Sequence, residues 1–353
     1  KGHYSNDLRY VLSLQNTIAA FEEIKTWEGY AKTPLHSLDS VASDIGVKNI
    51  YYKDESSRFG LGSFKALGGT YGVLKFIYHA LKKEIGDEVS MKDIHAGKYS
   101  EQISKYTVTT ATDGNHGRSV AFGAKLFGCK CQVYIHSEVS SGRQKAMEDL
   151  EATVNRVSGN YDESLQICIE DAGKNNWYVI SDTSYEGYTK YPRYIMAGYN
   201  VMAEEIIDQI KDCPLPTHVF LQGGVGSFPG AICGYFWEKF PGNNIKFVVV
   251  ESEYAPCLIR SAQNNQMTSV NIKQETMMAG LSCGEPSLLG WEILKSGADD
   301  FITINDSSIP GLMRLLAENN LKIEAGESSV AGLAGLIESM EDQKIAKAMG
   351  LNK

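Results

Sequence analysis

The sequence predicts an α/β protein made of two doubly wound, parallel-sheet domains. Short apolar segments rich in β-branched residues recur along the chain, and helical stretches separate most of them. This alternation is typical of parallel sheets covered by helices. The chain has 353 residues, which leaves room for about two domains. The expected strands are residues 49–53, 106–110, 130–135, 153–157, 178–181, 218–222, 246–251, 301–304 and 322–324.

Composition and charge favour a soluble enzyme. The net charge is −9 and no Lys/Arg cluster with interleaved aromatic residues occurs, which argues against nucleic acid as a partner. No apolar run approaches the roughly 20 residues of a membrane span, and no signal-type segment opens the chain. We therefore expect a cytoplasmic protein without a membrane partner. The seven cysteines have no zinc spacing, so no metal site is expected.

The first candidate functional residue is Lys65, in the run from Ser63 to Gly69. It follows an expected strand and opens a long expected helix. Positive charge at a helix N-terminus lowers the pKa of an amine, and an unprotonated amine can form a Schiff base with a carbonyl group. For Lys65 taken alone, the alternative is a solvated surface lysine.

The second candidate segment joins a β-branched strand to an apolar helix through Thr112, Asp113, Gly114, Asn115 and His116. Such a turn presents backbone N–H groups at a helix N-terminus, where a carboxylate is well placed. The side-chain amide of Asn115 is a donor suited to a phenolate oxygen. The alternative is an ordinary loop in which Asp113 or Asn115 caps the helix.

The third candidate segment is a glycine-rich loop, Gly223-Gly224-Val225-Gly226-Ser227, which follows a strand and precedes a helix. Glycines let the backbone fold closely around an anion, and the helix dipole adds to the attraction, so the loop predicts phosphate binding. It lacks the Gly-Lys-Ser/Thr ending of a P-loop, and no N-terminal βαβ unit surrounds it as in a dinucleotide site. The alternative is a tight turn.

In this order the three segments resemble the β-elimination enzymes that depend on pyridoxal 5'-phosphate, with the fold type II of tryptophan synthase β and threonine deaminase. The resemblance runs from Thr33 to Gly332. It implies that Lys65 holds the cofactor, that Asn115 contacts its ring hydroxyl, and that the glycine-rich loop binds its phosphate. Ser328 or Ser329 would face the ring nitrogen, where a neutral partner leaves a weaker electron sink.

The same resemblance implies the domain organisation. A large cofactor-binding domain would comprise residues 1–68 and 189–353, and a small inserted domain would comprise residues 69–188. The active site would lie in the cleft between them and close on a small amino-acid substrate. Members of the family are usually homodimers.

Two acids narrow the resemblance. Asp113 stands where the simple deaminases usually carry Ser or Ala, and Asp182 ends the expected strand at residues 177–181, at the edge where α/β sheets bind ligands. With residues 277–286, these segments resemble the diaminopropionate ammonia-lyases, which convert D- and L-2,3-diaminopropionate to pyruvate and two ammonia molecules. The Cα protons of the two isomers point to opposite faces. The resemblance therefore implies Asp182 as base for the L-isomer and Asp113 for the D-isomer.

Other functions stay open on the sequence alone. A serine or threonine deaminase, or a hydroxyaspartate ammonia-lyase, would share the fold and cofactor, and the two acids would then begin a turn or cap a helix. Lys65 argues against a non-catalytic binding protein. The lack of an early ribose-binding acid argues against a nucleotide-binding oxidoreductase. Cys257 and Cys283 lie in expected loops near the site, where they either form a redox-sensitive disulfide or stay reduced.

Overall fold

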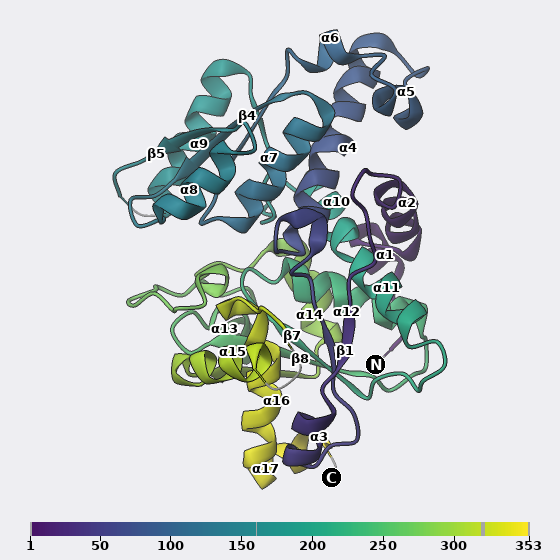
Figure 1. Cartoon of the computed structure of the whole chain (residues 1–353), viewed down its shortest axis with the longest axis vertical. Coiled ribbons are helices and arrows are strands. Elements are labelled where there is room, and N and C mark those ends of the chain that lie inside the picture. Colours follow the sequence, from purple (N-terminus) through teal and green to yellow (C-terminus); the bar gives the residue numbers. More distant parts are fainter. Residues whose placement is uncertain (1, 160, 319–321, 352–353) are drawn as a thin grey trace. The chain divides into compact units, whose positions relative to one another are not determined.

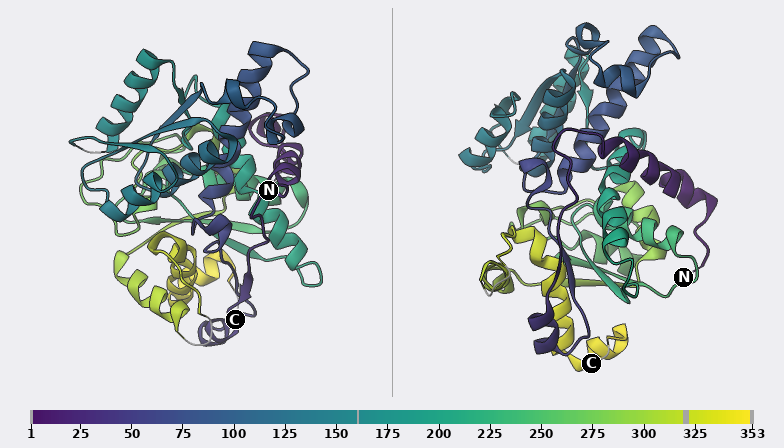
Figure 2. Two further views of the ribbon diagram at one scale, coloured as in Figure 1. Left: turned by 45° about the horizontal axis from the view of Figure 1, so that its top comes forward. Right: turned by 45° about the vertical axis from the view of Figure 1, so that its right-hand side comes forward.

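The computed structural model describes residues 2–159, 161–318 and 322–351, and the chain packs into two compact units. The first unit comprises Lys1–Ile18, Gly29–Gly62 and Asn200–Lys353, and the second comprises Ala19–Glu28 and Ser63–Tyr199. The second unit thus contains the expected small domain, residues 69–188, together with its flanking residues 63–68 and 189–199 and the short segment 19–28. Figure 1 labels the elements of both units, and Figure 2 gives two further views.

The second unit is built on a four-stranded parallel sheet with strand order β5-β4-β3-β6. Its strands are β3 (Thr107–Ala111), β4 (Lys130–Ile135), β5 (Thr153–Arg156) and β6 (Tyr178–Val179). Its helices are α4 (Lys65–Ile85), α5 (Met91–His95), α6 (Ser100–Ile103), α7 (Asn115–Phe127), α8 (Ser141–Glu148), α9 (Tyr161–Asn175) and α10 (Lys190–Tyr199). Helix α2 (Leu14–Ile24) has residues in both units.

Helices cover both faces of this sheet. Tyr134 of β4 belongs to an apolar cluster with Cys168 of α9. The neighbouring Val133 points to the opposite face, because successive strand residues alternate. There, a Cβ atom added to Gly117 of α7 would lie 3.2 Å from Val133 Cγ1. Helices α9 and α7 therefore pack on opposite faces, which confirms the doubly wound architecture.

Helix α4 packs closely on α7 and α10 because small residues line its contacts. A Cβ atom added to Gly68 would lie 2.3 Å from Cε1 of Tyr199, and one added to Gly69 would lie 2.4 Å from Oγ of Ser119. The Ser119 hydroxyl accepts from the backbone N–H of Thr70 at 3.0 Å and donates to the carbonyl oxygen of Lys65 at 2.5 Å. These bonds fix the first turn of α4, where Lys65 lies.

The first unit contains a three-stranded parallel sheet, β7-β8-β9, and a two-stranded antiparallel sheet, β1-β2. Its strands are β1 (Leu35–Ser37), β2 (Tyr51–Lys53), β7 (His218–Gln222), β8 (Lys246–Ser252) and β9 (Asp300–Ile304). Its α-helices are α1 (Asn6–Val11), α3 (Asp39–Ile45), α11 (Val201–Gln209), α12 (Ser227–Lys239), α13 (Cys257–Asn264), α14 (Leu288–Gly297), α15 (Ile309–Ala317), α16 (Ala331–Glu341) and α17 (Gln343–Met349). Short 3-10 turns are η1 (Arg58–Gly60), η2 (Ala279–Leu281), η3 (Asp306–Ser308) and η4 (Glu327–Val330).

The parallel sheet of the first unit is also covered on both faces. A Cβ atom added to Gly335 of α16 would lie 2.7 Å from Cγ2 of Val250 in β8. Phe247, three residues earlier in the same strand, points the other way, and its ring centroid lies 6.4 Å from that of Phe236 in α12. The predicted parallel sheets are thus present in each unit.

Two features of the predicted strands are wrong. Residues 322–324 do not form a strand: Lys322 has a φ of 51°, and the N–H of Ile323 donates to the carbonyl oxygen of Leu316, so the chain bends back onto α15. The strand at residues 51–53 pairs antiparallel with β1, a three-residue strand that was not predicted, rather than joining a parallel sheet. A strand so short carries too few residues for a period-2 pattern.

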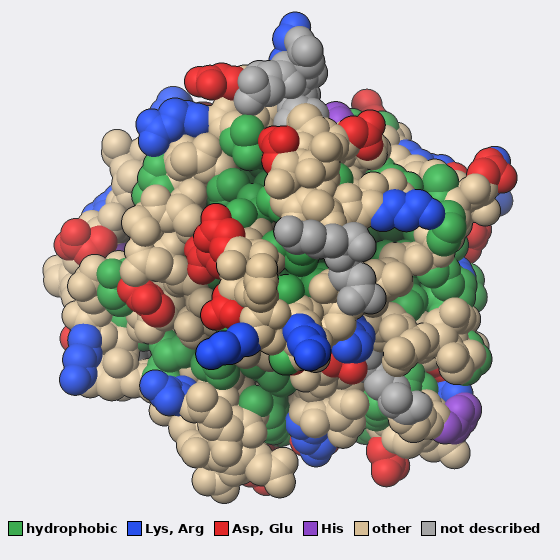
Figure 3. Space-filling view, turned by 90° about the horizontal axis from the view of Figure 1, so that it is seen from below, with side chains coloured by type: hydrophobic (Ala, Val, Ile, Leu, Met, Phe, Trp, Pro, Cys, Tyr) green, Lys and Arg blue, Asp and Glu red, His purple; other side chains and the backbone are tan. Residues whose placement is uncertain are grey.

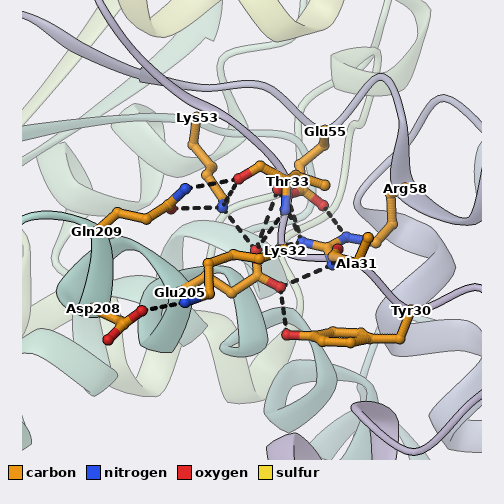
Figure 4. Close-up of polar contacts among 10 residues, drawn as sticks. All are labelled: Tyr30, Ala31, Lys32, Thr33, Lys53, Glu55, Arg58, Glu205, Asp208 and Gln209. Atoms are coloured by element: carbon orange, nitrogen blue, oxygen red, sulfur yellow. Dashed lines mark hydrogen bonds and ion pairs between the residues drawn. The ribbon is translucent and has the colours of Figure 1, made fainter.

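A buried ion cluster links η1 and the end of β2 to α11 within the first unit (Figure 4). Arg58 and Glu205 are almost fully buried, and Nη2 of Arg58 donates to Oε2 of Glu205 at 2.8 Å. Lys53 donates to the same oxygen at 2.7 Å, and Arg58 also donates from Nε to Glu55 at 2.8 Å. The hydroxyl of Tyr30 donates to the other oxygen of Glu205 at 2.9 Å. Each buried charge is therefore paired and hydrogen-bonded.

Acidic and basic side chains are interspersed over the face of the molecule shown in Figure 3. Among the helices of the described residues, none has the length and apolar character needed to cross a membrane.

Candidate active site

Lys65 and Asp182 form an ion pair within the second unit. The Nζ atom of Lys65 donates to Oδ2 of Asp182 at 2.9 Å, and the two side chains are 26% and 17% exposed. Lys65 is the first residue of α4, and Asp182 lies just after β6. An amine and a carboxylate are therefore in direct contact in a partly buried site.

His116 is the second neighbour of Asp182. Its Nε2 lies 2.8 Å from the carbonyl oxygen of Ile180, which only accepts hydrogen bonds, so this nitrogen carries a proton. Its Nδ1 lies 3.7 Å from Oδ2 of Asp182. Burial acts to raise the pKa of Asp182, but His116 and the Lys65 ammonium more than offset it, so the pKa lies well below the usual carboxyl range. Asp182 is therefore a carboxylate at neutral pH.

The segment that carries Asp182 is fixed by Tyr188. The Tyr188 hydroxyl accepts from the backbone N–H of Ser181 at 3.0 Å and donates to the carbonyl oxygen of Val179 at 2.9 Å. The backbone N–H of Ile180 still donates to the carbonyl oxygen of Thr109 in β3 at 2.8 Å, while the Tyr188 hydroxyl bonds the backbone of Val179 and Ser181. The strand predicted at residues 178–181 is shorter in the structure, where β6 ends at Val179.

Asp113 is held by a histidine and does not cap the following helix. Its Oδ1 lies 2.8 Å from Nε2 of His136. The N-terminus of α7 is instead satisfied by Thr112, whose Oγ1 accepts from the backbone N–H groups of Gly114 and Gly117 at 3.0 and 3.1 Å. Asn115 is exposed at the first residue of α7. The alternative in which Asp113 or Asn115 caps this helix is therefore wrong.

Three polar residues lie at the carboxyl edge of one sheet. Asp182 follows β6, Asp113 follows β3 and His136 follows β4, and these three strands are neighbours in the parallel order β4-β3-β6. Parallel strands present their carboxyl ends at the same edge, where open α/β sheets bind ligands. His136 was missed from the sequence, although it stands directly after an expected strand, as Asp182 does.

The glycine-rich loop lies in the first unit, between β7 and α12, and its shape depends on its glycines. Gly226 has a φ of 98°, which residues with a Cβ rarely adopt. A Cβ atom added to Gly224 would lie 2.9 Å from the carbonyl oxygen of Gly280. The hydroxyl of Ser227 donates to that of Ser287 at 3.0 Å. The loop leads directly into the N-terminus of the 13-residue helix α12, an arrangement suited to an anion.

The two candidate serines near the C-terminus differ in their surroundings. Oγ of Ser328 would lie 3.1 Å from a Cβ atom added to Gly280, the residue packed against Gly224. The hydroxyl of Ser329 instead donates to the carbonyl oxygen of Gly326 at 2.6 Å. Ser328 is therefore the serine whose hydroxyl lies beside the segment that supports the glycine-rich loop.

Two cysteines and one unpredicted acid surround the same loop. Neither Cys257 nor Cys283 forms a disulfide, and Sγ of Cys257 lies 3.6 Å from the carbonyl oxygen of Gly224. Glu251 is fully buried and accepts from the backbone N–H groups of Leu258 and Ile259 at 2.8 and 2.7 Å, at the start of α13. Burial raises the pKa of Glu251 to about 8. Glu251 could have been found from the sequence, because it is the last residue of the apolar strand expected at residues 246–251.

These features fit the cofactor that the sequence suggested. Lys65 provides an amine beside a carboxylate, and the first unit provides a loop in which added Cβ atoms would collide with the backbone. A sequence model of the family described as pyridoxal-phosphate dependent enzymes matches residues 26–349. The chain belongs to this family.

The relatives it resembles include two ammonia-lyases. The chain is 37% identical over 333 residues to the diaminopropionate ammonia-lyase of Escherichia coli K12, covering 92% of this chain and 82% of the relative. It is 36% identical to the same enzyme of Salmonella typhimurium LT2, covering 94% and 84% of the two chains. The crystal structure of the Escherichia coli enzyme in complex with D-serine matches with a TM-score of 0.86 at 35% identity, covering 97% of this chain and 87% of that one.

Proposed function

We propose that this protein is a diaminopropionate ammonia-lyase, which converts D- and L-2,3-diaminopropionate and one water to pyruvate and two ammonia molecules. The observation that carries the proposal is the pair of carboxylates at one sheet edge, with Asp182 bonded to Lys65 and Asp113 following the neighbouring strand. Simple deaminases have no need of two acids. The similarity to two diaminopropionate ammonia-lyases, over 92% and 94% of this chain, supports the same substrate.

The cofactor would be held by residues from the three sequence segments and by one serine. Lys65 would bond to its aldehyde carbon, Gly223–Ser227 would bind its phosphate, and Asn115 would contact its ring hydroxyl. Ser328, rather than Ser329, would face the ring nitrogen, because the Ser329 hydroxyl donates to Gly326. When bound, pyridoxal phosphate supplies a conjugated ring that makes the Cα proton of the substrate acidic.

The two acids would divide the substrates between them. One rigid base cannot reach Cα protons that point to opposite faces, because proton transfer needs a heavy-atom approach of about 3 Å. Asp182, ionised beside Lys65, would accept the proton of the L-isomer, and Asp113 would accept that of the D-isomer. The Lys65–Asp182 pair can then hold a proton between Nζ and Oδ2, where it is available to the departing β-amine.

Turnover of both isomers by the purified holoenzyme tests this function. Pyruvate and ammonia are measured with L- and D-2,3-diaminopropionate, with L-serine and L-threonine as controls. We expect two ammonia molecules per pyruvate from each isomer. Asp182→Asn should lose mainly L-turnover and Asp113→Asn mainly D-turnover. Turnover of serine or threonine alone would be consistent with the fold and the cofactor but would contradict the assigned substrate. The two acids would then have no separate catalytic roles.

We further propose that the enzyme acts in the cytoplasm as a homodimer. Light scattering after size-exclusion chromatography tests the assembly, since a dimer has twice the chain mass of 38.8 kDa. A single peak at the mass of one chain would contradict the dimer without bearing on the reaction.

A further inference from the structure

We infer that His136 is a positioning residue that fixes the carboxylate of Asp113 for reaction of the D-isomer. The inference rests on the proposed function, in which Asp113 is the base for that isomer. The two acids differ in how they are held, since Asp182 bonds to the cationic Lys65 and Asp113 bonds to the ring of His136. The two acids are therefore held by different partners.

Hydrogen bonds on both ring nitrogens define the state of His136. The backbone N–H of Glu138 donates to Nδ1 at 3.3 Å, so Nδ1 accepts and carries no proton. The single ring proton is then on Nε2, which donates to Oδ1 of Asp113 at 2.8 Å. The ring is thus a neutral donor. It orients the carboxylate of Asp113 through this hydrogen bond.

The loop that carries His136 is itself anchored. Nη1 of Arg156 donates to the carbonyl oxygens of His136 and Ser137 at 3.3 and 2.7 Å. The hydroxyl of Ser137 donates to the carbonyl oxygen of Gly159 at 3.0 Å. The side chain of His136 is 19% exposed, against 33% for Asp113. A fixed, mostly buried ring therefore holds a more exposed carboxylate.

The consequence for catalysis is confined to one isomer. A catalytic group must be held within roughly 0.5 Å of its working position, and a partly exposed carboxylate without its donor samples other rotamers. Hydrogen bonds to charged groups are the stronger ones, so losing this bond should lower kcat for the D-isomer about 10- to 100-fold. The L-isomer uses Asp182, and its kcat should change by less than about twofold.

The test compares three variants of the holoenzyme on both isomers. His136→Asn is too short to donate at the position of Nε2, whereas His136→Gln places an amide N–H there and should restore D-turnover to within about threefold of wild type. Arg156→Gln is the comparison variant, because it loosens the same loop but leaves the ring donor, so it should lower D-turnover less than His136→Asn does. We expect kcat, more than KM, to fall for the D-isomer, and to fall furthest in His136→Asn.

Several outcomes would overturn the inference. Equal loss on both isomers, an undiminished D-turnover in His136→Asn, or a His136→Gln variant as weak as His136→Asn would each assign the ring a purely structural role. If wild type turns over only the L-isomer, the inference fails while the lyase function stands; if it turns over neither, the proposed function fails.

A measurement independent of activity checks the contact itself. Long-range ¹H–¹⁵N correlation of histidine-labelled protein, with His136→Asn identifying the signal, should show the Nε2–H tautomer. That signal should shift in Asp113→Asn. A ring with its proton on Nδ1, or a signal insensitive to Asp113→Asn, would contradict the arrangement even in a protein that turns over neither isomer.

Discussion

The amine of Lys65 and the carboxylate of Asp182, 117 positions apart in the sequence, are joined by a hydrogen bond of 2.9 Å. The first turn of α4 supplies one partner, and the segment after β6 supplies the other. The pair places the proposed base of the L-isomer next to the nitrogen that would hold the cofactor. Because His116 also lies 3.7 Å from the same oxygen, Asp182 keeps a polar neighbour when Lys65 changes.

Replacing Lys65 should separate the chemical role of this lysine from its electrostatic role. Lys65→Ala and Lys65→Arg should both lower elimination by at least about 10³-fold, because neither supplies a primary amine. Lys65→Arg keeps a cation beside Asp182, so its free energy of unfolding should be close to that of wild type. Lys65→Ala should lose about 1–3 kcal/mol of stability. Activity, urea unfolding and borohydride labelling measure these effects. Borohydride fixation of cofactor to another lysine in Lys65→Ala would contradict the assignment.

Much of this arrangement could be predicted because strand ends are visible in sequence. Asp113 and Asp182 each follow an apolar strand, and the glycine-rich loop is continuous along the chain. What could not be predicted are pairings between distant segments. The partners Asp113–His136 and Lys65–Asp182 depend on the strand order β4-β3-β6, and no local pattern encodes that order.

The helix cap also shows where local patterns fall short. Asp113 and Asn115 are common capping types, yet Thr112 takes that role because its hydroxyl reaches two backbone N–H groups. Choosing among adjacent polar residues requires the backbone conformation of the turn, in which Gly114 has a φ of 157°. The prediction of a strand at residues 322–324 was wrong for a similar reason. Lys322 has a positive φ, and the residue type lysine does not indicate this conformation.

Substitution at Gly226 should weaken cofactor retention beyond its effect on stability. Gly226→Ala forces a Cβ atom onto a φ of 98°, 3.0 Å from Cδ2 of Leu258. Gly242→Ala is the matched control, because Gly242 has a φ of 84° with no atom within 4 Å of the added Cβ. Each should cost about 1–2 kcal/mol through backbone strain. Bound cofactor absorbance after dialysis should fall only in Gly226→Ala, and equal retention in both variants would argue against phosphate binding by this loop.

Removing the charge of Glu205 should destabilise the first unit strongly. Glu205→Gln leaves Arg58 and Lys53 without the carboxylate that both contact, and an uncompensated buried charge costs about 3–5 kcal/mol. Asp208→Asn is the control on the same helix, since the Lys32–Asp208 pair has side chains 40% and 59% exposed and solvent screening should leave its contribution to stability small. Urea unfolding measures both. Similar losses in the two variants would mean that solvent reaches the cluster.

The buried Glu251 makes stability depend on pH in a defined direction. Burial raises the pKa of Glu251 in the folded protein from 4.5 to about 8, and the carboxyl accepts from two backbone N–H groups at the start of α13. Between these two values the folded state binds a proton that the unfolded state has released. The contribution of Glu251 is therefore fully present below the unfolded pKa and is lost as pH rises toward the folded pKa.

Glu251→Gln should remove this dependence while keeping an acceptor oxygen at the helix start. Urea unfolding of both proteins from pH 5 to pH 8 gives the difference between their free energies of unfolding at each pH. The titration of all other groups contributes equally to both proteins and cancels in this difference. Over that range wild type should lose about 2–4 kcal/mol relative to Glu251→Gln. Parallel curves would mean that Glu251 is ionised in the folded protein throughout, held by the two N–H groups and the dipole of α13. Its carboxylate would then be a permanent negative charge beneath the glycine-rich loop, unfavourable to an anion bound there.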